Sequence, residues 1–154
     1  MIRLDQAASA DDLALARELF LEYQRAVGVD LCFQGFQAEV AGLPGAYAPP
    51  RGRLLLARVD GEPAGCGALR PLGEGAAELK RMWVRPAFRG RGLGRAVAEA
   101  LLRAAGEEGY ALVRLDTLPV MTEAQALYRS LGFVPAQPRD DPPHPGAIHM
   151  ELRL

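Results

Sequence analysis

The sequence predicts one α/β domain of the α+β kind, spanning residues 1–154, with a mixed but mostly antiparallel sheet of about six or seven strands flanked by about four helices. The length of 154 residues, with 49% hydrophobic and 24% charged residues, is typical of one globular domain with a buried core. Strand-like segments joined by glycine turns predict an antiparallel meander in the middle of the chain. A strand, a glycine-rich loop, a helix and a strand then follow, and this order predicts a crossover between parallel strands.

The amino-terminal part of the chain predicts an edge strand and two helices. Residues 2–4 form a short apolar run, which suits the edge strand. Ser9 precedes Asp12 by three residues, which resembles a capping box with Asp in place of Glu, and apolar residues at helical spacing continue to Val27. A shorter helix is expected over residues 36–43, where a Pro-Gly turn ends it.

The meander is expected to contain three strands, at residues 53–59, 64–72 and 78–84. Asp60 and Gly61 form a hairpin turn signal between the first two strands, and a Gly-Glu-Gly turn separates the second from the third. Pro86 then ends strand pairing, because proline has no amide hydrogen to donate.

The carboxy-terminal half alternates between helices and strands. Leu93, Val97 and Leu101 form the apolar stripe of a helix that follows the glycine-rich loop. The apolar strand at residues 111–117 suits a buried position in the sheet. The remaining elements are expected to be a helix over residues 122–131, a strand that opens at residue 133, a loop with five prolines over residues 135–146 and a last strand over residues 148–154.

Charge and composition argue against several kinds of partner. The net charge is −1, whereas proteins that neutralise many phosphates are usually strongly basic, so no nucleic-acid partner is expected. The two cysteines show neither a disulfide framework nor the Cys/His spacing of a zinc site, so no metal is expected. The sequence has no signal-peptide pattern and no apolar run of membrane-spanning length, so we expect a cytoplasmic protein without a membrane partner.

The glycine-rich loop, RPAFRGRGLGRAV over residues 85–97, has glycines at positions 90, 92 and 94. A dinucleotide fingerprint fails in both registers, although Asp116 lies one strand later, where a ribose-binding acid would stand, so that alternative stays open. No Gly-Lys-Ser/Thr follows, which excludes a Walker A loop. What remains is a helix amino terminus whose free amides, positive dipole and closely approaching backbone suit a pyrophosphate. The alternative is a solvated arginine loop whose glycines serve only to turn the chain.

Three segments carry a resemblance to a known family. The segment VRPAFRGRGLGRAVAEALL resembles motif A of the GCN5-related N-acetyltransferases, whose signature is Arg/Gln-x-x-Gly-x-Gly/Ala. ELKRMWV resembles the fourth strand of that family, and EAQALYRSLGFVP resembles its motif B. The order and spacing of the three segments match across residues 50–154, and residues 1–27 match in outline. The resemblance implies an acyl-CoA N-acyltransferase fold.

The resemblance also implies a donor substrate, acetyl-CoA, and the residues that hold it. Its pyrophosphate is expected on the backbone amides of Arg89, Gly90, Arg91, Gly92, Leu93, Gly94 and Arg95. The strand end formed by Met82, Trp83 and Val84 is expected to pair with the pantetheine arm, and the amide of Val84 or its neighbour to face the thioester oxygen. Such a donor stabilises negative charge that develops on this oxygen.

Two residues are candidates for moving protons. Tyr128 matches the family tyrosine that protonates the leaving thiolate; the alternative is that it only packs on its helix. Glu78 is the first candidate for the base that deprotonates the attacking amine, and its alternative is a salt-bridged or solvated strand residue. Asp116 is the second candidate, and it stands where many members carry an asparagine, so no side-chain role transfers to it from the family. His149, in the last strand, is expected to be packed rather than active.

The resemblance does not identify the acceptor. In this family the acceptor site is built from segments that correspond here to residues 27–47 and 135–146. We expect a primary amine of a small molecule or amino acid, attacked directly in a ternary complex by a monomer or homodimer. A protein or peptide acceptor stays open, and so does a non-catalytic acyl-CoA-binding module that has lost turnover.

Overall fold

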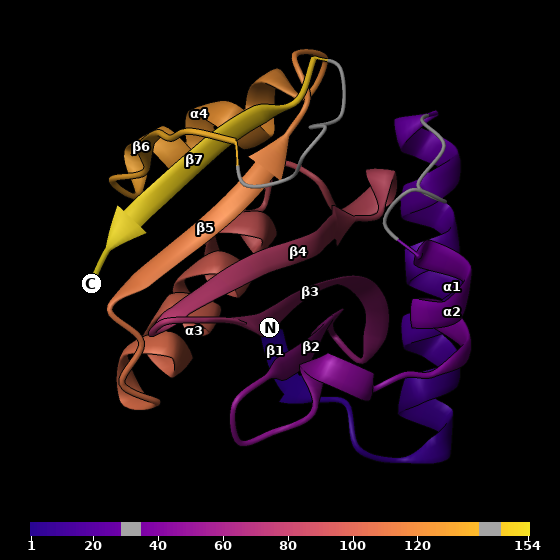
Figure 1. Cartoon of the computed structure of the whole chain (residues 1–154). Coiled ribbons are helices and arrows are strands. Elements are labelled where there is room, and N and C mark those ends of the chain that lie inside the picture. The colour runs from indigo at the N-terminus through magenta and orange to yellow at the C-terminus, as the bar shows by residue number, and fades with distance from the viewer. Residues whose placement is uncertain (29–34, 139–145) are drawn as a thin grey trace.

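The computed structural model describes residues 1–28, 35–138 and 146–154 (Figure 1). Its helices are α1 (Ala10–Val27), α2 (Phe36–Ala41), α3 (Leu93–Glu107) and α4 (Thr122–Ser130), with short 3₁₀ turns at Gly45–Tyr47 and Pro86–Phe88. Its strands are β1 (Ile2–Gln6), β2 (Arg53–Val59), β3 (Glu62–Gly73), β4 (Ala76–Val84), β5 (Leu112–Thr117), β6 (Val134–Pro135) and β7 (Ile148–Arg153). The predicted order of helices and strands is confirmed.

The strands form one seven-stranded sheet in the order β1-β2-β3-β4-β5-β7-β6. Every neighbouring pair is antiparallel except β4 and β5, which are parallel and joined through α3. The predicted mixed, mostly antiparallel sheet with about four helices is therefore confirmed. The strand at residues 2–4 is an edge strand, as predicted, and it extends to Gln6.

Helices cover both faces of the sheet, with α3 and α4 on one face and α1 and α2 on the other (Figure 1). An apolar cluster under α3 contains Leu93, Val97 and Leu101. A second cluster under α1 and α2 contains Phe20 and Phe36. The periodic stripes of the two long helices thus bury against opposite faces of one sheet.

Several predicted boundaries shift by one or two residues. The helix expected over residues 36–43 ends at Ala41, because Gly42 caps it and Pro44 has no amide hydrogen to continue it. The loop expected over residues 135–146 begins with the short strand β6, and its residues 139–145 lie outside the described part of the chain. Residues 29–34 of the expected acceptor region also lie outside it.

The parallel pair β4 and β5 positions the site. The two strands pair only where residues 76–78 lie beside residues 112–114. Beyond this level the carboxy-terminal ends of β4 and β5 diverge (Figure 1). The ends of parallel strands are where α/β sheets commonly hold ligands.

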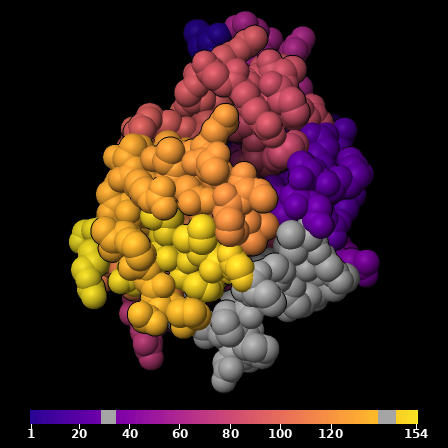
Figure 2. Space-filling model, turned by 90° about the horizontal axis from the view of Figure 1, so that it is seen from above, coloured from indigo at the N-terminus to yellow at the C-terminus, as the bar shows by residue number. Residues whose placement is uncertain are grey.

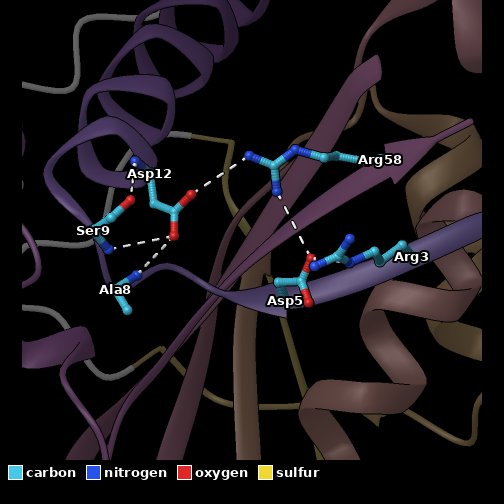
Figure 3. Close-up of polar contacts among 6 residues, drawn as sticks. All are labelled: Arg3, Asp5, Ala8, Ser9, Asp12 and Arg58. Atoms are coloured by element: carbon cyan, nitrogen blue, oxygen red, sulfur yellow. Dashed lines mark hydrogen bonds and ion pairs between the residues drawn. The ribbon is translucent and has the colours of Figure 1, made fainter. Parts of the chain in front are cut away.

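A polar network ties the start of α1 to the edge of the sheet (Figure 3). The Ser9 hydroxyl accepts a hydrogen bond from the Asp12 amide at 3.1 Å, and the predicted capping box is confirmed. Asp12 Oδ2 accepts from the amides of Ala8 and Ser9 at 3.1 and 3.4 Å. Arg58 of β2 joins Asp12 to Asp5 of β1, at 3.5 and 3.8 Å. These bonds hold the pKa of Asp12 below its ordinary value; the backbone bond from Ala8 contributes most.

Replacing Asp12 with asparagine is expected to lower stability at neutral pH by about 0.5–1 kcal/mol, because the capping box loses its charged acceptor. The lowered folded-state pKa makes the carboxylate stabilising above the unfolded-state pKa of about 3.9, and this contribution is lost as pH falls through the folded value. Thermal unfolding across pH should therefore show the wild type and Asp12→Asn converging in acid. A constant difference at all pH values would contradict the assignment.

Candidate active site

A cavity of about 710 Å³ opens where β4, the glycine-rich loop, α4 and the end of α1 meet. Figure 2 shows the surface hollowed between the rose, orange and indigo segments that belong to these elements. Of the predicted donor-binding residues, those that line the cavity are Met82, Trp83, Val84, Arg89, Gly90, Gly92, Leu93, Gly94, Arg95 and Tyr128. Arg91 is not among its lining residues.

The glycine-rich loop brings backbone rather than side chains to the cavity. Gly90 and Gly92 have φ values of +80° and +75°, in the left-handed region that favours glycine. Gly92 is the N-cap of α3 and supplies no side-chain cap, so the first amides of the helix keep their hydrogens for a ligand. A Cβ on Gly94 would fit the fold but would stand at the cavity wall, between Leu127 and Val84. This backbone surface and the helix dipole fit the pyrophosphate of acetyl-CoA.

Two arginines of the loop, Arg89 and Arg95, lie at the walls of this pocket. Arg89 donates from Nε to the carbonyl of Val84 at 3.1 Å, and its guanidinium lies 5.0 Å from the centroid of the Trp83 ring. Arg95, in the first turn of α3, also lines the cavity. Arg89 and Arg95 therefore both stand at the edge of the cavity.

A β-bulge re-aims the end of β4. Cys66 of β3 pairs with Trp83 and Ala68 pairs with Lys80, so that Arg81 and Met82 together face Gly67. Arg81 has a φ of +58°, which is left-handed and unusual for a residue that is not glycine. After this bulge Met82, Trp83 and Val84 all line the cavity. The local sequence contains no sign of the bulge.

Tyr128 projects from α4 to the cavity and is only 5% exposed. Its ring packs edge-on against Phe133, with the centroids 5.9 Å apart. Burial raises the pKa of the phenol above its ordinary value. The hydroxyl therefore keeps its proton at neutral pH.

A second tyrosine, Tyr23 of α1, also lines the cavity. Its ring contacts Trp83 edge-on at a centroid distance of 6.4 Å, and burial raises its pKa. Sequence reasoning assigned Tyr23 only to the apolar stripe of its helix. Only the position of α1 across the end of β4 distinguishes this tyrosine from a core residue.

The two candidate bases lie in different surroundings. Neither Glu78 nor Asp116 is among the cavity-lining residues, and Glu78 Oε1 accepts from both Nε and Nη2 of Arg70 at 2.8 Å. Asp116 lies on the part of β5 that has diverged from β4, and its Oδ1 is 2.7 Å from Nδ1 of His149. His149 is 8% exposed, so it is packed, as expected, and is also paired with a carboxylate. The role of Glu78 as the base stays a prediction.

Within residues 1–28, 35–138 and 146–154, no group of three or more His, Cys, Asp and Glu side chains is placed to bind a metal ion. Among these same residues, no helix has the length and apolar character needed to cross a membrane.

Comparisons with known proteins agree with the fold. The model of the acetyltransferase (GNAT) family matches residues 15–133. An uncharacterized N-acetyltransferase of Schizosaccharomyces pombe is 37% identical over 145 residues, which cover 93% of this chain and 89% of that protein. Human N-acetylaspartate synthetase is 38% identical over 86 residues, which cover 55% of this chain and 28% of the synthetase.

A solved structure shows the same fold over the whole chain. The PaiA N-acetyltransferase of Thermoplasma acidophilum, determined in complex with coenzyme A, superposes with a TM-score of 0.76 and 16% identity, covering 100% of this chain and 99% of its own. The family match spans the glycine-rich loop, the end of β4 and Tyr128. The chain belongs to the GNAT family of acetyl-CoA-dependent N-acetyltransferases.

Proposed function

We propose that this protein transfers an acetyl group from acetyl-CoA to the primary amine of a small molecule or amino acid, by direct attack in a ternary complex. One observation carries the proposal: the glycine-rich loop, the exposed end of β4 and the buried phenol of Tyr128 line the same cavity. This arrangement supplies an anion site, a strand edge and a proton donor together.

In this proposal acetyl-CoA supplies the activated acyl group, and the chain binds and orients it. The amides of residues 89–95 hold the pyrophosphate. The edge of residues 82–84 pairs with the pantetheine arm, and the Val84 amide donates to the thioester oxygen as negative charge develops there.

The proton transfers follow from the chemistry of the exchange. The neutral amine nitrogen attacks the carbonyl carbon, the C–N bond forms and the C–S bond breaks. Tyr128 gives its proton to the thiolate sulfur, whose conjugate acid has a pKa of about 8.5 as a free thiol. A base accepts the proton that the amine loses, and Tyr128 is reprotonated from solvent.

For the base, the proposal favours Asp116 over Glu78, since Arg70 holds Glu78 where β4 and β5 are still paired. Asp116→Asn is expected to lower kcat/KM about 100-fold, whereas Glu78→Gln retains most of it. The measurement is kcat/KM against pH at saturating acetyl-CoA. If the acidic limb of the kcat/KM profile disappears in Glu78→Gln and persists in Asp116→Asn, the base is Glu78.

The name of one relative bears on the class of acceptor. The human relative is named for N-acetylaspartate, an acetylated amino acid. A panel of small amines and free amino acids, assayed with acetyl-CoA by release of free thiol, tests the proposal. Turnover of at least one small amine is the expected result. Acetyl-CoA binding without thiol release above hydrolysis would instead indicate a non-catalytic binding module, and turnover of peptide amines alone would indicate a protein acceptor.

A further inference from the structure

The bulge residue Arg81 is held by an ion pair that the proposed chemistry does not use. Arg81 is 3% exposed, and its Nε and Nη2 donate to the two carboxylate oxygens of Glu39 at 2.7 and 3.0 Å. The guanidinium also lies 4.8 Å from the centroid of the Phe36 ring. The Glu39 carboxylate and the Phe36 ring both come from α2, which packs on the face of the sheet opposite α3.

Glu39 and Arg81 both carry their charges at neutral pH. Burial opposes the charge on each side chain, but the hydrogen bonds and opposite charge outweigh it. The pKa of Glu39 therefore lies below its ordinary value and the pKa of Arg81 lies above its own. A buried pair of this kind is costly to break on one side only, because the remaining charge stays unpaired.

The backbone around Arg81 is fixed from the other direction by β3. The thiol of Cys66 donates to the Arg81 carbonyl at 3.3 Å. Gly67, opposite the bulge, leaves room for the side chains of Met82 and Val97, since a Cβ there would lie 2.6 Å from Met82 Sδ and 2.6 Å from Val97 Cγ1. The left-handed φ of Arg81 is thus imposed by contacts on both sides of the strand and is not favoured by the residue itself.

We propose that Glu39 is a positioning residue, which clamps Arg81 in its left-handed conformation and thereby aims residues 82–84, including the Val84 amide, at the thioester. This inference rests on the proposed function, because it assigns the Val84 amide to the thioester oxygen. Through Glu39, α2, which lies in the region expected to bind the acceptor, would help to position the amide that polarises the thioester carbonyl of the donor.

Two double variants separate the clamp from mere stability. Glu39→Ala/Arg81→Ala and Glu39→Ala/Arg81→Gly both remove the ion pair without leaving a buried charge. Only the second places at position 81 a residue that adopts φ +58° freely. Glu151→Ala, which removes the partner of the half-buried Arg114 on β5, serves as the control for loss of an ion pair.

The readout is the ¹³C chemical shift of acetyl-CoA labelled at its carbonyl carbon and bound to each protein, with kcat measured in parallel. The Arg81→Ala double variant is expected to lose the downfield shift of the bound carbonyl and about 100-fold in kcat, since a misplacement of about 1 Å costs that much. The Arg81→Gly double variant should recover most of both. Glu151→Ala should lower the melting temperature and leave the carbonyl shift unchanged.

Equal carbonyl shifts in the wild type and in both double variants would overturn the inference, as would equal losses in the two double variants. The shift needs no acceptor, so a wild type that polarises the carbonyl without acetylating any amine would refute the proposed function and leave the clamp supported.

Discussion

Replacing Tyr128 with phenylalanine is expected to lower kcat by about 100-fold or more while the dissociation constant for CoA stays near that of the wild type. The ring fills its place against Phe133 in both proteins, so packing is conserved and only the hydroxyl is lost. Without that proton the thiolate must leave as an anion or wait for water. Steady-state kinetics and calorimetric titration with CoA measure the two quantities separately.

Two other tyrosines make this test specific. Tyr23→Phe alters the second phenol of the cavity, and its loss of kcat is expected to be much smaller than that of Tyr128→Phe. Tyr110→Phe removes a hydroxyl that donates to the Arg51 carbonyl at 2.8 Å; neither residue lines the cavity, so this change should reduce stability alone. If Tyr23→Phe has the larger effect, the proton donor is Tyr23.

The pH dependence of the wild-type rate gives a further test of the role of Tyr128. Burial raises the pKa of Tyr128, so the phenol stays protonated throughout the range in which the amine acceptor becomes neutral. The rate should therefore rise with pH as base and amine lose their protons, and it should not fall again from ionisation of Tyr128. A descending alkaline limb that disappears in Tyr128→Phe would contradict this reading.

The sequence predicts the elements of this fold well because their signals are local. The capping box at Ser9, the Asp60-Gly61 turn and the glycines before α3 each act within a few residues of themselves. The predicted donor-binding residues are also close together in the sequence, since most of them belong to one loop and the helix after it, and their role stays a prediction. Tyr128 reaches that site because α4 follows β5 directly.

Features that depend on contacts between distant segments were not predicted. The bulge at Arg81 faces Gly67 on the neighbouring strand, and the Arg81 side chain pairs with Glu39 on α2. The sequence of residues 78–84 indicates neither partner. The partner of Glu78, in contrast, was predictable from the sequence. With a hairpin turn centred on Glu74, positions 70 and 78 lie opposite each other, and this register alone would have paired Glu78 with Arg70.

Replacing Gly94 with alanine is expected to raise the stability of the fold and lower its affinity for CoA, a combination that only a binding glycine gives. The Cβ would lie 3.5 Å from Leu127 Cδ2 and 4.0 Å from Val84 Cγ2, both ordinary contacts, so the fold accommodates it. Helix α3 then gains up to about 1 kcal/mol in propensity. The methyl group, however, occupies the surface where the pyrophosphate must approach the amides.

The matched control is Gly106→Ala, near the other end of the same helix, where a Cβ meets nothing within 4 Å and the position does not line the cavity. Both variants should gain similar stability in thermal unfolding, but only Gly94→Ala should lose affinity. The loss of one charge-assisted amide bond, about 1.5–3 kcal/mol, corresponds to about 10- to 100-fold in the dissociation constant. Gly92→Ala should lower both the stability of the fold and the affinity for CoA, because the φ of +75° at this position strains alanine. Unchanged CoA affinity in Gly94→Ala would mean that the pyrophosphate does not lie on the amides of this loop, and the arginine side chains would then have to hold it.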